Sequence, residues 1–337
     1  MRVGIVGGGL AGCSCARMLA DKGIEVEIFE KEGHIGGLMY DKDNDDIFQH
    51  FGPHIFHTSN PNVINFVLRF ARWKGFCNRP LAITDEGFAR LPISIETIAD
   101  LKGDKLGEEV YDFEEERGLI YDNIIKGYSK KQWGKPNEDA VKRLRVSQTI
   151  GGSYFDDVFE GLPIGGFYKF LCNMIDHENV KAVHLNKKII QFEQPFDAII
   201  WTAPIDEHPS CEIDLRWNGT AFLRTHSKEN FLTAVYNYNV DYVPWTRRTK
   251  MKLLTGCESE DILIEIPRAD DNAKHYILEM DEFEKKYIDR FMWIEGMGNS
   301  YFCGRSATAK YLDMDEVIEQ AENVVENVCS RAVLSDT

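Results

Sequence analysis

The first 37 residues constrain the fold more than any other part of the chain. An apolar run at residues 3–6 is followed by a glycine-rich turn, a helical pattern and a second apolar run at residues 25–29. The glycines Gly7, Gly9 and Gly12 have the GxGxxG spacing at the point where the first strand would enter the helix. This order of elements predicts a βαβ unit that holds a dinucleotide.

Each glycine of this motif has its own mechanical role. Gly7 permits the tight turn, Gly9 lets the backbone approach a pyrophosphate, and Gly12 lets the helix pack closely on the strand. The free amides and the dipole at the start of the helix attract phosphates. Glu30 ends the second strand, where its carboxylate can accept hydrogen bonds from a ribose diol. We therefore expect an uncharged 2′-hydroxyl there, not a phosphate.

A second glycine pair, Gly36 and Gly37, follows shortly after Glu30. This arrangement resembles FAD-binding proteins more than NAD dehydrogenases, so the expected cofactor is FAD. Glycine-rich turns also occur for purely steric reasons. Here the strand, turn, helix, second strand and acid all agree, which favours the functional interpretation.

Length and charge limit the class of protein further. A chain of 337 residues exceeds one ordinary domain, so two or three units are expected. The net charge of −16 argues against a nucleic-acid partner, because a polyphosphate backbone would be repelled. No stretch approaches the roughly 20 apolar residues of a membrane span, and glycines interrupt the N-terminal apolar run, unlike a secretory signal. We expect a cytoplasmic protein without a membrane span.

The eight cysteines form no paired CxxC motifs. Cys13 and Cys15 would point in different directions on a helix, which favours reduced core thiols over metal ligands. His54 and His57 are three residues apart, but no carboxylate or cysteine is nearby in a ligand pattern. A turn with one buried histidine is therefore favoured over a metal site, and we expect no metal.

The middle of the chain predicts helices. Residues 60–75 have apolar residues at helical spacing after a capping Asn60. Residues 94–144 are helical in pattern and highly charged, as expected of an inserted helical domain. Within them, two lysines alone would form a solvated face, but the flanking Tyr128 and Trp133 offer a surface on which a base can stack.

The remaining segments predict a return to the first domain around a second sheet. A helix at residues 167–174, strands near 180–185 and 196–204, and a last strand and helix after residue 300 would complete the Rossmann-like unit. The expected fold class is α/β, with a Rossmann-like FAD-binding domain, an inserted helical domain and an antiparallel β-sheet substrate domain. The expected boundaries are 1–75 (FAD-binding, first part), 76–145 (helical insertion with the uridine-binding motif), 146–210 (return to the FAD-binding domain), 211–298 (antiparallel sheet) and 299–337 (FAD-binding, third part).

Motifs along most of the chain resemble the UDP-galactopyranose mutase family in their order and spacing. They are residues 52–58, Asn78 with Arg79, residues 91–93, residues 127–134, Leu162 with Pro163, Thr246 with Arg247, and Arg305 with residues 311–315. The resemblance implies a flavoenzyme that interconverts UDP-galactopyranose, or a close relative, and its furanose form without net oxidation. In that family N5 of the reduced flavin attacks the anomeric carbon, UDP leaves, and the sugar recloses through another hydroxyl. The implied partners are a UDP-sugar substrate and a second copy of the chain in a homodimer.

The resemblance also implies roles for individual residues. His57 resembles the histidine against the isoalloxazine, and Asn78 resembles a polar contact to the sugar. The uridine-binding residues would be Tyr128, Ser129 and Trp133. The residues expected around the diphosphate, sugar and flavin are Arg247, Tyr276, Arg305 and Tyr311. Asp313 resembles the acid beside the last flavin contact, and the adjacent Met314 is also expected to bind the cofactor. Catalytic roles are expected for His57, Arg247, Arg305 and Tyr311.

Two positions depart from the family pattern. Ser147 stands where the family has an arginine on a substrate loop, and Phe159 stands where it has a diphosphate-binding tyrosine. Loss of a cation and a phenol should weaken UDP binding, by about 1.5–3 kcal/mol for a charged hydrogen bond. Our hypothesis is that Arg145, two residues before Ser147, compensates as a substrate-binding residue.

Two other functions remain open from the sequence. An FAD-dependent oxidoreductase of the amine oxidase type shares the βαβ opening but has no use for a uridine platform. A non-catalytic nucleotide-sugar-binding homologue would keep the fold and have lost turnover through Ser147 and Phe159.

Overall fold

A five-stranded parallel sheet forms the base of the molecule. The computed structural model describes all residues except 108, 110, 137–149, 191–194, 279 and 336–337. The strand order is β10 (Val180–His184), β2 (Glu25–Phe29), β1 (Arg2–Val6), β11 (Ala198–Trp201) and β18 (Ser300–Phe302). The predicted Rossmann-like unit is confirmed, and β1 is central because its apolar residues are buried on both faces.

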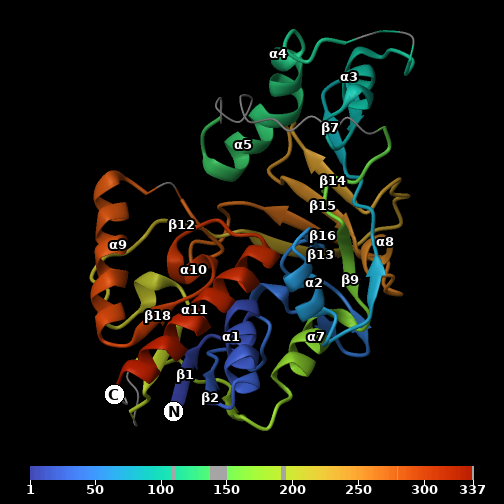
Figure 1. The fold of residues 1–337 in the computed structure, drawn as a ribbon. Helices are drawn as coiled ribbons and strands as arrows, with labels where there is room; N and C mark the ends of the chain where they lie inside the picture. The colour runs from blue at the N-terminus through green and yellow to red at the C-terminus, as the bar shows by residue number, and fades with distance from the viewer. Residues whose placement is uncertain (108, 110, 137–149, 191–194, 279, 336–337) are drawn as a thin grey trace.

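Helices cover this sheet. The glycine turn leads into α1 (Leu10–Asp21), which packs against α7 (Gly166–Ile175) and α11 (Met314–Ser335) around the largest apolar core. Cys13 and Cys15 lie inside this core with no exposed surface. A second apolar cluster lies under α9 (Glu282–Met297), which packs against β18. The two chain termini lie close together at the bottom of the view in Figure 1, near β1. Among the described residues, no helix is both long and apolar enough to cross a bilayer.

A six-stranded sheet forms the second layer of structure. Its order is β13 (Ala221–His226), β16 (Asp261–Ile266), β15 (Arg247–Lys250), β14 (Val235–Tyr238), β7 (Leu81–Thr84) and β8 (Gly87–Arg90). The neighbouring strands run antiparallel except for the parallel pair of β14 and β7. Two of its strands, β7 and β8, therefore lie within residues 76–145, which were expected to form the helical insertion, and the helices of that segment begin only after residue 90.

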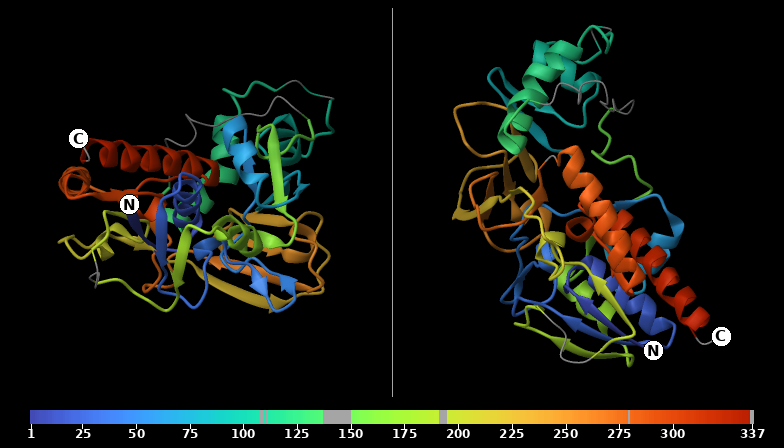
Figure 2. Two further views of the ribbon diagram at one scale, coloured as in Figure 1. Left: turned by 60° about the horizontal axis from the view of Figure 1, so that its bottom comes forward. Right: turned by 90° about the vertical axis from the view of Figure 1, so that its left-hand side faces the viewer.

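The helical insertion lies at the end of the molecule opposite the chain termini (Figures 1 and 2). It contains α3 (Ile95–Lys102), α4 (Arg117–Ile120), a π-helical turn η2 (Tyr121–Ile125) and α5 (Lys126–Trp133). Ser94 and Thr97 form a capping box at the start of α3. Gly134 ends α5 in the left-handed region with φ of 80°.

A three-stranded sheet shows that the predicted helix at residues 60–75 was too long. Helix α2 (Pro61–Val67) is capped by Asn60 as expected, but β6 (Trp73–Gly75) is a strand. It pairs with β9 (Phe159–Pro163), which also pairs with β5 (Phe56–Thr58). Trp73 packs on Phe56, so the long-range pairing and aromatic packing override the local helical pattern.

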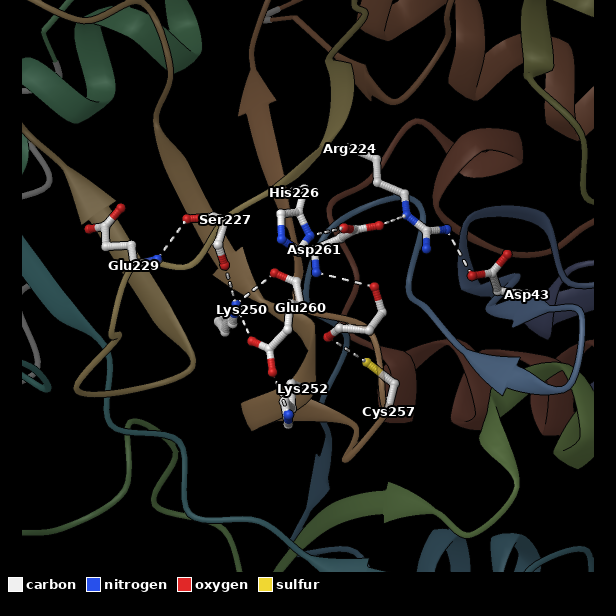
Figure 3. Close-up of polar contacts among 11 residues, drawn as sticks. Asp43, Arg224, His226, Ser227, Glu229, Lys250, Lys252, Cys257, Glu260 and Asp261 are labelled. Carbon is white, nitrogen blue, oxygen red and sulfur yellow. Dashed lines mark hydrogen bonds and ion pairs between the residues drawn. The ribbon is translucent and has the colours of Figure 1, made fainter.

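Ion pairs tie the second sheet to the N-terminal part of the chain (Figure 3). The strands β3 (Lys42–Asp43) and β4 (Asp46–Ile47) form a small hairpin. Arg224 on β13 bonds Asp43 of this hairpin at 2.8 Å and Asp261 of β16 at 2.7 Å. The remaining short elements are η1 (Gly37–Met39), η3 (Ile205–Glu207), β12 (Trp217–Asn218), α8 (Met251–Leu254), β17 (Tyr276–Ile277) and α10 (Arg305–Thr308).

Candidate active site

The glycine turn before α1 leaves a space that a ligand backbone can enter. Gly7 has φ of +105°, which L side chains rarely adopt, and a Cβ at Gly12 would lie 2.0 Å from the carbonyl oxygen of Gly7. Gly9 differs from both, because a Cβ there would meet nothing within 4 Å. Gly9 is also the N-cap of α1, and no side chain caps the helix there. Its first amides are therefore available to an anion.

The second glycine pair lies directly against the first turn. The amide of Gly36 donates to the carbonyl oxygen of Gly8 at 2.8 Å. A Cβ on Gly37 would lie 3.4 Å from the Cα of Gly9. Gly9 and Gly36 are 27 residues apart in the sequence. The two turns that contain them nevertheless line one narrow space.

Glu30 sits beside this space at the end of β2. Its carboxylate is buried and accepts hydrogen bonds from the amides of Gly8 at 2.7 Å and Glu32 at 2.9 Å. Each oxygen retains a second lone pair, so acceptance from a ribose hydroxyl is compatible with this geometry.

A cavity of about 650 Å³ lies between the helical insertion and the six-stranded sheet. It brings together residues from β5, α5, β15 and β17 and from the segment before α11. The expected site residues that line it are His57, Tyr128, Ser129, Trp133, Arg247, Tyr276, Tyr311 and Asp313. These positions span 256 residues of sequence, so only the tertiary fold assembles them.

Arg247 is held by partners on both neighbouring strands. In the sheet register it lies opposite Asn237 of β14 and Glu265 of β16. Its guanidinium donates to Asn237 Oδ1 at 3.3 Å and contacts Glu265 Oε2 at 3.4 Å. Nη2 also donates to the hydroxyl of Tyr128 at 3.0 Å. A cation fixed in this way can meet an anionic group without first reorganising.

Burial and neighbouring charges shape the acid–base properties here. Burial raises the pKa of Glu265, and the adjacent Arg247 partly opposes this rise. Burial acts to lower the pKa of Arg247, but Glu265 and the surrounding phenols outweigh it, so the guanidinium stays charged. Burial raises the pKa of Tyr128 to about 12, so its phenol remains a proton donor at neutral pH.

The helix α5 presents Tyr128 to this cation because of a glycine. A Cβ on Gly127 would lie 1.7 Å from the carbonyl oxygen of Asn239, so only glycine allows this approach. The side chain of Asn239 then accepts a hydrogen bond from the amide of Tyr128 at 2.9 Å. These contacts fix the first turn of α5 against the loop after β14.

Aromatic rings form another wall of the cavity. Tyr276 and Tyr311 stack with their centroids 6.4 Å apart, and Trp133 meets Tyr276 edge-on at 6.2 Å. The guanidinium of Arg305 lies over the ring of Tyr311 at 4.4 Å. Arg305 also donates to the carbonyl oxygen of Leu312 at 2.5 and 3.1 Å. This second cation is therefore fixed directly behind the tyrosines.

His57 enters the cavity from β5. Its ring stacks on Phe155 at 3.8 Å, and its Nδ1 lies 2.7 Å from Asp157 Oδ2. Asp313 lines the same cavity, and burial raises the pKa of its carboxyl while His57 acts to lower it. A histidine and the carboxylates of Asp156, Asp157 and Asp313 thus line the same cavity.

Several expected site residues lie elsewhere. The ring of Phe159 packs against Trp73 and Phe56, and Asn78 is a buried residue whose amide donates to Ser153 Oγ and Glu160 Oε1. Neither is among the described residues that line the cavity. Arg305 and Met314 are also outside that lining, Arg305 behind the tyrosines and Met314 as the first residue of α11. Arg145 and Ser147 fall outside the described residues.

The sequence alone did not identify several residues of the site, including four that support Arg247 or His57. Asn237 and Glu265 were missed because they are cross-strand neighbours of Arg247, which only the sheet register reveals. Phe155 and Asp157 were not assigned to His57, from which they are about 100 residues distant in sequence. The only available signal was that residues 154–155 belong to the aromatic motif near the glycine-rich turn.

The fold and the site define a protein of the dinucleotide-binding Rossmann type with a separate cavity lined by Arg247 and aromatic rings. The family model for an NAD(P)-binding Rossmann-like domain matches residues 5–70, and the model for UDP-galactopyranose mutase matches residues 123–311. A probable UDP-galactopyranose mutase of Klebsiella pneumoniae is 32% identical, over 94% of this chain and 92% of the relative. The chain belongs to the UDP-galactopyranose mutase family.

A second curated protein and a solved structure are also similar to this chain. A dTDP-fucopyranose mutase of Escherichia coli is 29% identical over 95% of this chain and 96% of that protein. A solved structure of a reduced UDP-galactopyranose mutase has the same fold, with a TM-score of 0.74 at 13% identity, over 98% of this chain and 94% of that one. The family assignment from sequence motifs is thereby confirmed.

Proposed function

We propose that the protein is a flavin-dependent mutase that interconverts the pyranose and furanose forms of a nucleoside-diphosphate hexose, with UDP-galactose as the first substrate to test. One observation carries the proposal. Arg247 is restrained between Asn237, Glu265 and Tyr128 and faces the same cavity as Trp133. A restrained cation beside an indole suits a diphosphate attached to a planar base.

The residues of the glycine turns fit FAD. The open space at Gly9, the uncapped start of α1 and the adjacent Gly37 support a pyrophosphate at this position, and Glu30 supports a ribose beside it. His57, Arg305, Asp313 and Met314 are proposed to hold the part of the cofactor nearer the cavity. Bound and reduced, the flavin would supply an electron-rich nucleophile.

The protein's own residues have three tasks in this proposal. Arg247, together with Arg305 behind the tyrosines, stabilises the negative charge that grows on a departing diphosphate. The phenols of Tyr128, Tyr276 and Tyr311 donate hydrogen bonds and limit the access of water. Trp133, with Ser129 on the same helix, holds the base and so keeps the departing nucleotide in the cavity for its return.

The proposal gives Phe159 and Arg145 supporting roles. Phe159 would shape the sheet beneath the substrate through its contacts with Trp73 and Phe56, in place of the phenol contact that the family pattern suggests. Arg145 would supply the cation that Ser147 lacks, and Asn78 would contact the sugar through movement of the adjoining loop. We also propose a homodimer and a cytoplasmic location, which size-exclusion chromatography with light scattering and cell fractionation would test.

The decisive experiment is turnover with dithionite-reduced protein. The purified protein is incubated with UDP-galactopyranose, and the products are separated by chromatography. We expect a UDP-furanose product, with no stoichiometric loss of reducing equivalents, and no product from oxidised protein. A protein that binds no flavin, or a reduced flavoprotein that yields no furanose from any nucleoside-diphosphate hexose, would contradict the proposal.

A second set of reactions separates the alternatives. Because a dTDP-fucopyranose mutase is 29% identical to this chain, dTDP-fucopyranose is tested in parallel. Oxidation of an amine with transfer of electrons to oxygen would favour the oxidoreductase reading. Binding of UDP without turnover would favour a non-catalytic homologue.

A further inference from the structure

His57 is aimed into the cavity by the alternation of β5. Its neighbours Phe56 and Thr58 have no exposed surface and point into the core, so the side chain between them points the opposite way. The ring lies almost parallel to that of Phe155, with an angle of 13° between the planes. Stacking restricts the tilt of the imidazole but does not determine which nitrogen carries the proton.

The tautomer is determined by Asp157. Its Oδ2 lies 2.7 Å from His57 Nδ1, and a carboxylate can only accept a hydrogen bond, so Nδ1 carries the hydrogen. In the neutral ring Nε2 is then an acceptor. Among the described residues, Nε2 has no hydrogen-bond partner, and His57 itself lines the cavity.

Asp157 is itself held in place by Ser59. The hydroxyl of Ser59 donates to Asp157 Oδ1 at 2.7 Å and accepts from the amide of Val158 at 3.2 Å. The two carboxylate oxygens therefore have separate tasks, one towards His57 and one towards Ser59. Because Ser59 directly follows β5, the same strand end that carries His57 also anchors its partner.

We infer that Asp157, supported by Ser59, is a positioning residue that fixes His57 with an unprotonated Nε2 facing the cavity. This inference depends on the proposed mutase function. When the ring changes size, the C4 hydroxyl loses its proton as its oxygen bonds to C1, and the oxygen on C5 gains a proton as it becomes a free hydroxyl. Ring opening precedes closure, so the oxygen on C5 first takes its proton from solvent. Nε2 then accepts the proton of the C4 hydroxyl as the C4 oxygen bonds to C1 and releases it to solvent, so no proton is gained or lost overall.

Other ionisable groups share this side of the cavity and must be considered with His57. They are Asp156 and Tyr154 on the same segment as Asp157, and Tyr311 and Asp313 before α11. Of these, Asp313 interacts electrostatically with His57. Among the described residues, only Asp157 bonds a ring nitrogen of His57, so its replacement should change the tautomer, whereas changes at the other positions alter only the surrounding field.

The test combines turnover with the NMR signature of the histidine. In Asp157→Asn the amide can donate to Nδ1, which shifts the hydrogen to Nε2. We expect kcat to fall by roughly 10–100-fold with little change in KM for the nucleotide sugar, and an altered pH profile of kcat. In the ¹⁵N-histidine-labelled flavoprotein, the His57 signals, assigned with His57→Gln, should change from the Nδ1–H to the Nε2–H tautomer.

Two additional variants keep the test interpretable. Asp85→Asn makes the same chemical change on the exposed turn between β7 and β8 and should leave both readouts unchanged. Ser59→Ala keeps the carboxylate but loosens it, and should lower kcat by roughly 3–10-fold with a mixture of tautomers. The inference is wrong if Asp157→Asn keeps the original tautomer, or if it changes the tautomer without affecting kcat. If Asp157→Asn does not fold, an unchanged tautomer and an unchanged kcat in Ser59→Ala would overturn the inference. Failure of the unmodified protein to turn over any sugar would instead refute the proposed function, and the tautomer measurement would still stand by itself.

Discussion

Arg247 and Glu265 face each other across β15 and β16, with 3.4 Å between Nη1 and Oε2. Both side chains are largely withdrawn from solvent, and a Cβ on Gly52 would lie 3.3 Å from Glu265 Oε1. The carboxylate is therefore enclosed between the sheet and the loop that leads to β5. In this arrangement Glu265 acts on a ligand only through Arg247, whose direction it fixes.

Replacing Glu265 with Gln should loosen Arg247 and destabilise the protein. We expect the free energy of unfolding to fall by roughly 1.5–3 kcal/mol, the value of a charged hydrogen bond, and the affinity for UDP to fall by about tenfold. Urea denaturation and calorimetric titration with UDP measure the two effects. The control is Glu258→Gln, the same change at an exposed residue before β16. Unchanged UDP affinity in Glu265→Gln would show that Arg247 does not depend on this partner.

The two glycines Gly9 and Gly12 provide a matched pair that separates cofactor binding from folding. Gly9→Ala places a methyl group in open space, so the apoprotein should keep its stability while the Kd for FAD rises by at least about tenfold. Gly12→Ala places it 2.0 Å from the carbonyl oxygen of Gly7, which should cost about 1–3 kcal/mol of stability or prevent folding. Thermal unfolding of apoprotein and fluorescence titration with FAD give both quantities. Equal FAD affinity in Gly9→Ala and the unmodified protein would rule out a pyrophosphate at this turn.

Local patterns predicted much of the first domain. The elements β1, α1 and β2 could be predicted from apolar periodicity and from glycines within 30 residues of sequence. The helices α7 and α11 could likewise be predicted from their local sequence patterns. The segment at Trp73–Gly75 was predicted wrongly, because its conformation is set by pairing with β9, nearly 90 residues later. The parallel pairing of β7 and β14 was beyond local reasoning for the same reason.

The same distinction applies to the site. Residues within recognisable motifs, such as Tyr128, Trp133 and Arg247, could be selected from the sequence, and the structure brings them to one cavity. Their supporting partners could not be selected, because Glu265 and Asp157 become relevant only through strand register and loop packing. Arg224 illustrates the point outside the site, since its link from β13 to Asp43 spans 181 residues.

Trp133 should contribute to nucleotide binding through stacking. Removing the indole in Trp133→Ala should weaken UDP binding by about 1–3 kcal/mol, the usual value of a base on an aromatic ring. Galactose 1-phosphate, which lacks the base, should bind both proteins equally. The control is Trp293→Ala, because Trp293 is 66% exposed on α9 and lies outside the cavity lining. A similar loss for galactose 1-phosphate would indicate that Trp133 shapes the whole cavity and does not hold the base.

His54 should make the stability of the protein depend on pH in a defined window. Burial lowers the pKa of His54 to about 4, and the positive charges of Arg305 and Arg247 act in the same direction, while its hydrogen bond to Gly52 opposes them. The unfolded chain binds a proton near pH 6.5 and the folded chain only near pH 4, so the unfolded state holds more protons between these values. Stability contributed by the neutral ring is therefore complete above pH 6.5 and falls as the pH drops towards 4, by at most about 3 kcal/mol.

The measurement is urea denaturation of the unmodified protein and His54→Gln at intervals from pH 7.5 to 4. Other carboxylates titrate in both proteins, so the difference between the two curves isolates His54. We expect His54→Gln to be less stable at pH 7.5, because it loses the imidazole and its hydrogen bond to the carbonyl oxygen of Gly52. That deficit should shrink as the pH falls, since only the unmodified protein must exclude a proton from His54. Parallel curves for the two proteins would mean that His54 takes up its proton equally in the folded and unfolded states, and would contradict its placement near the positive charges of Arg305 and Arg247.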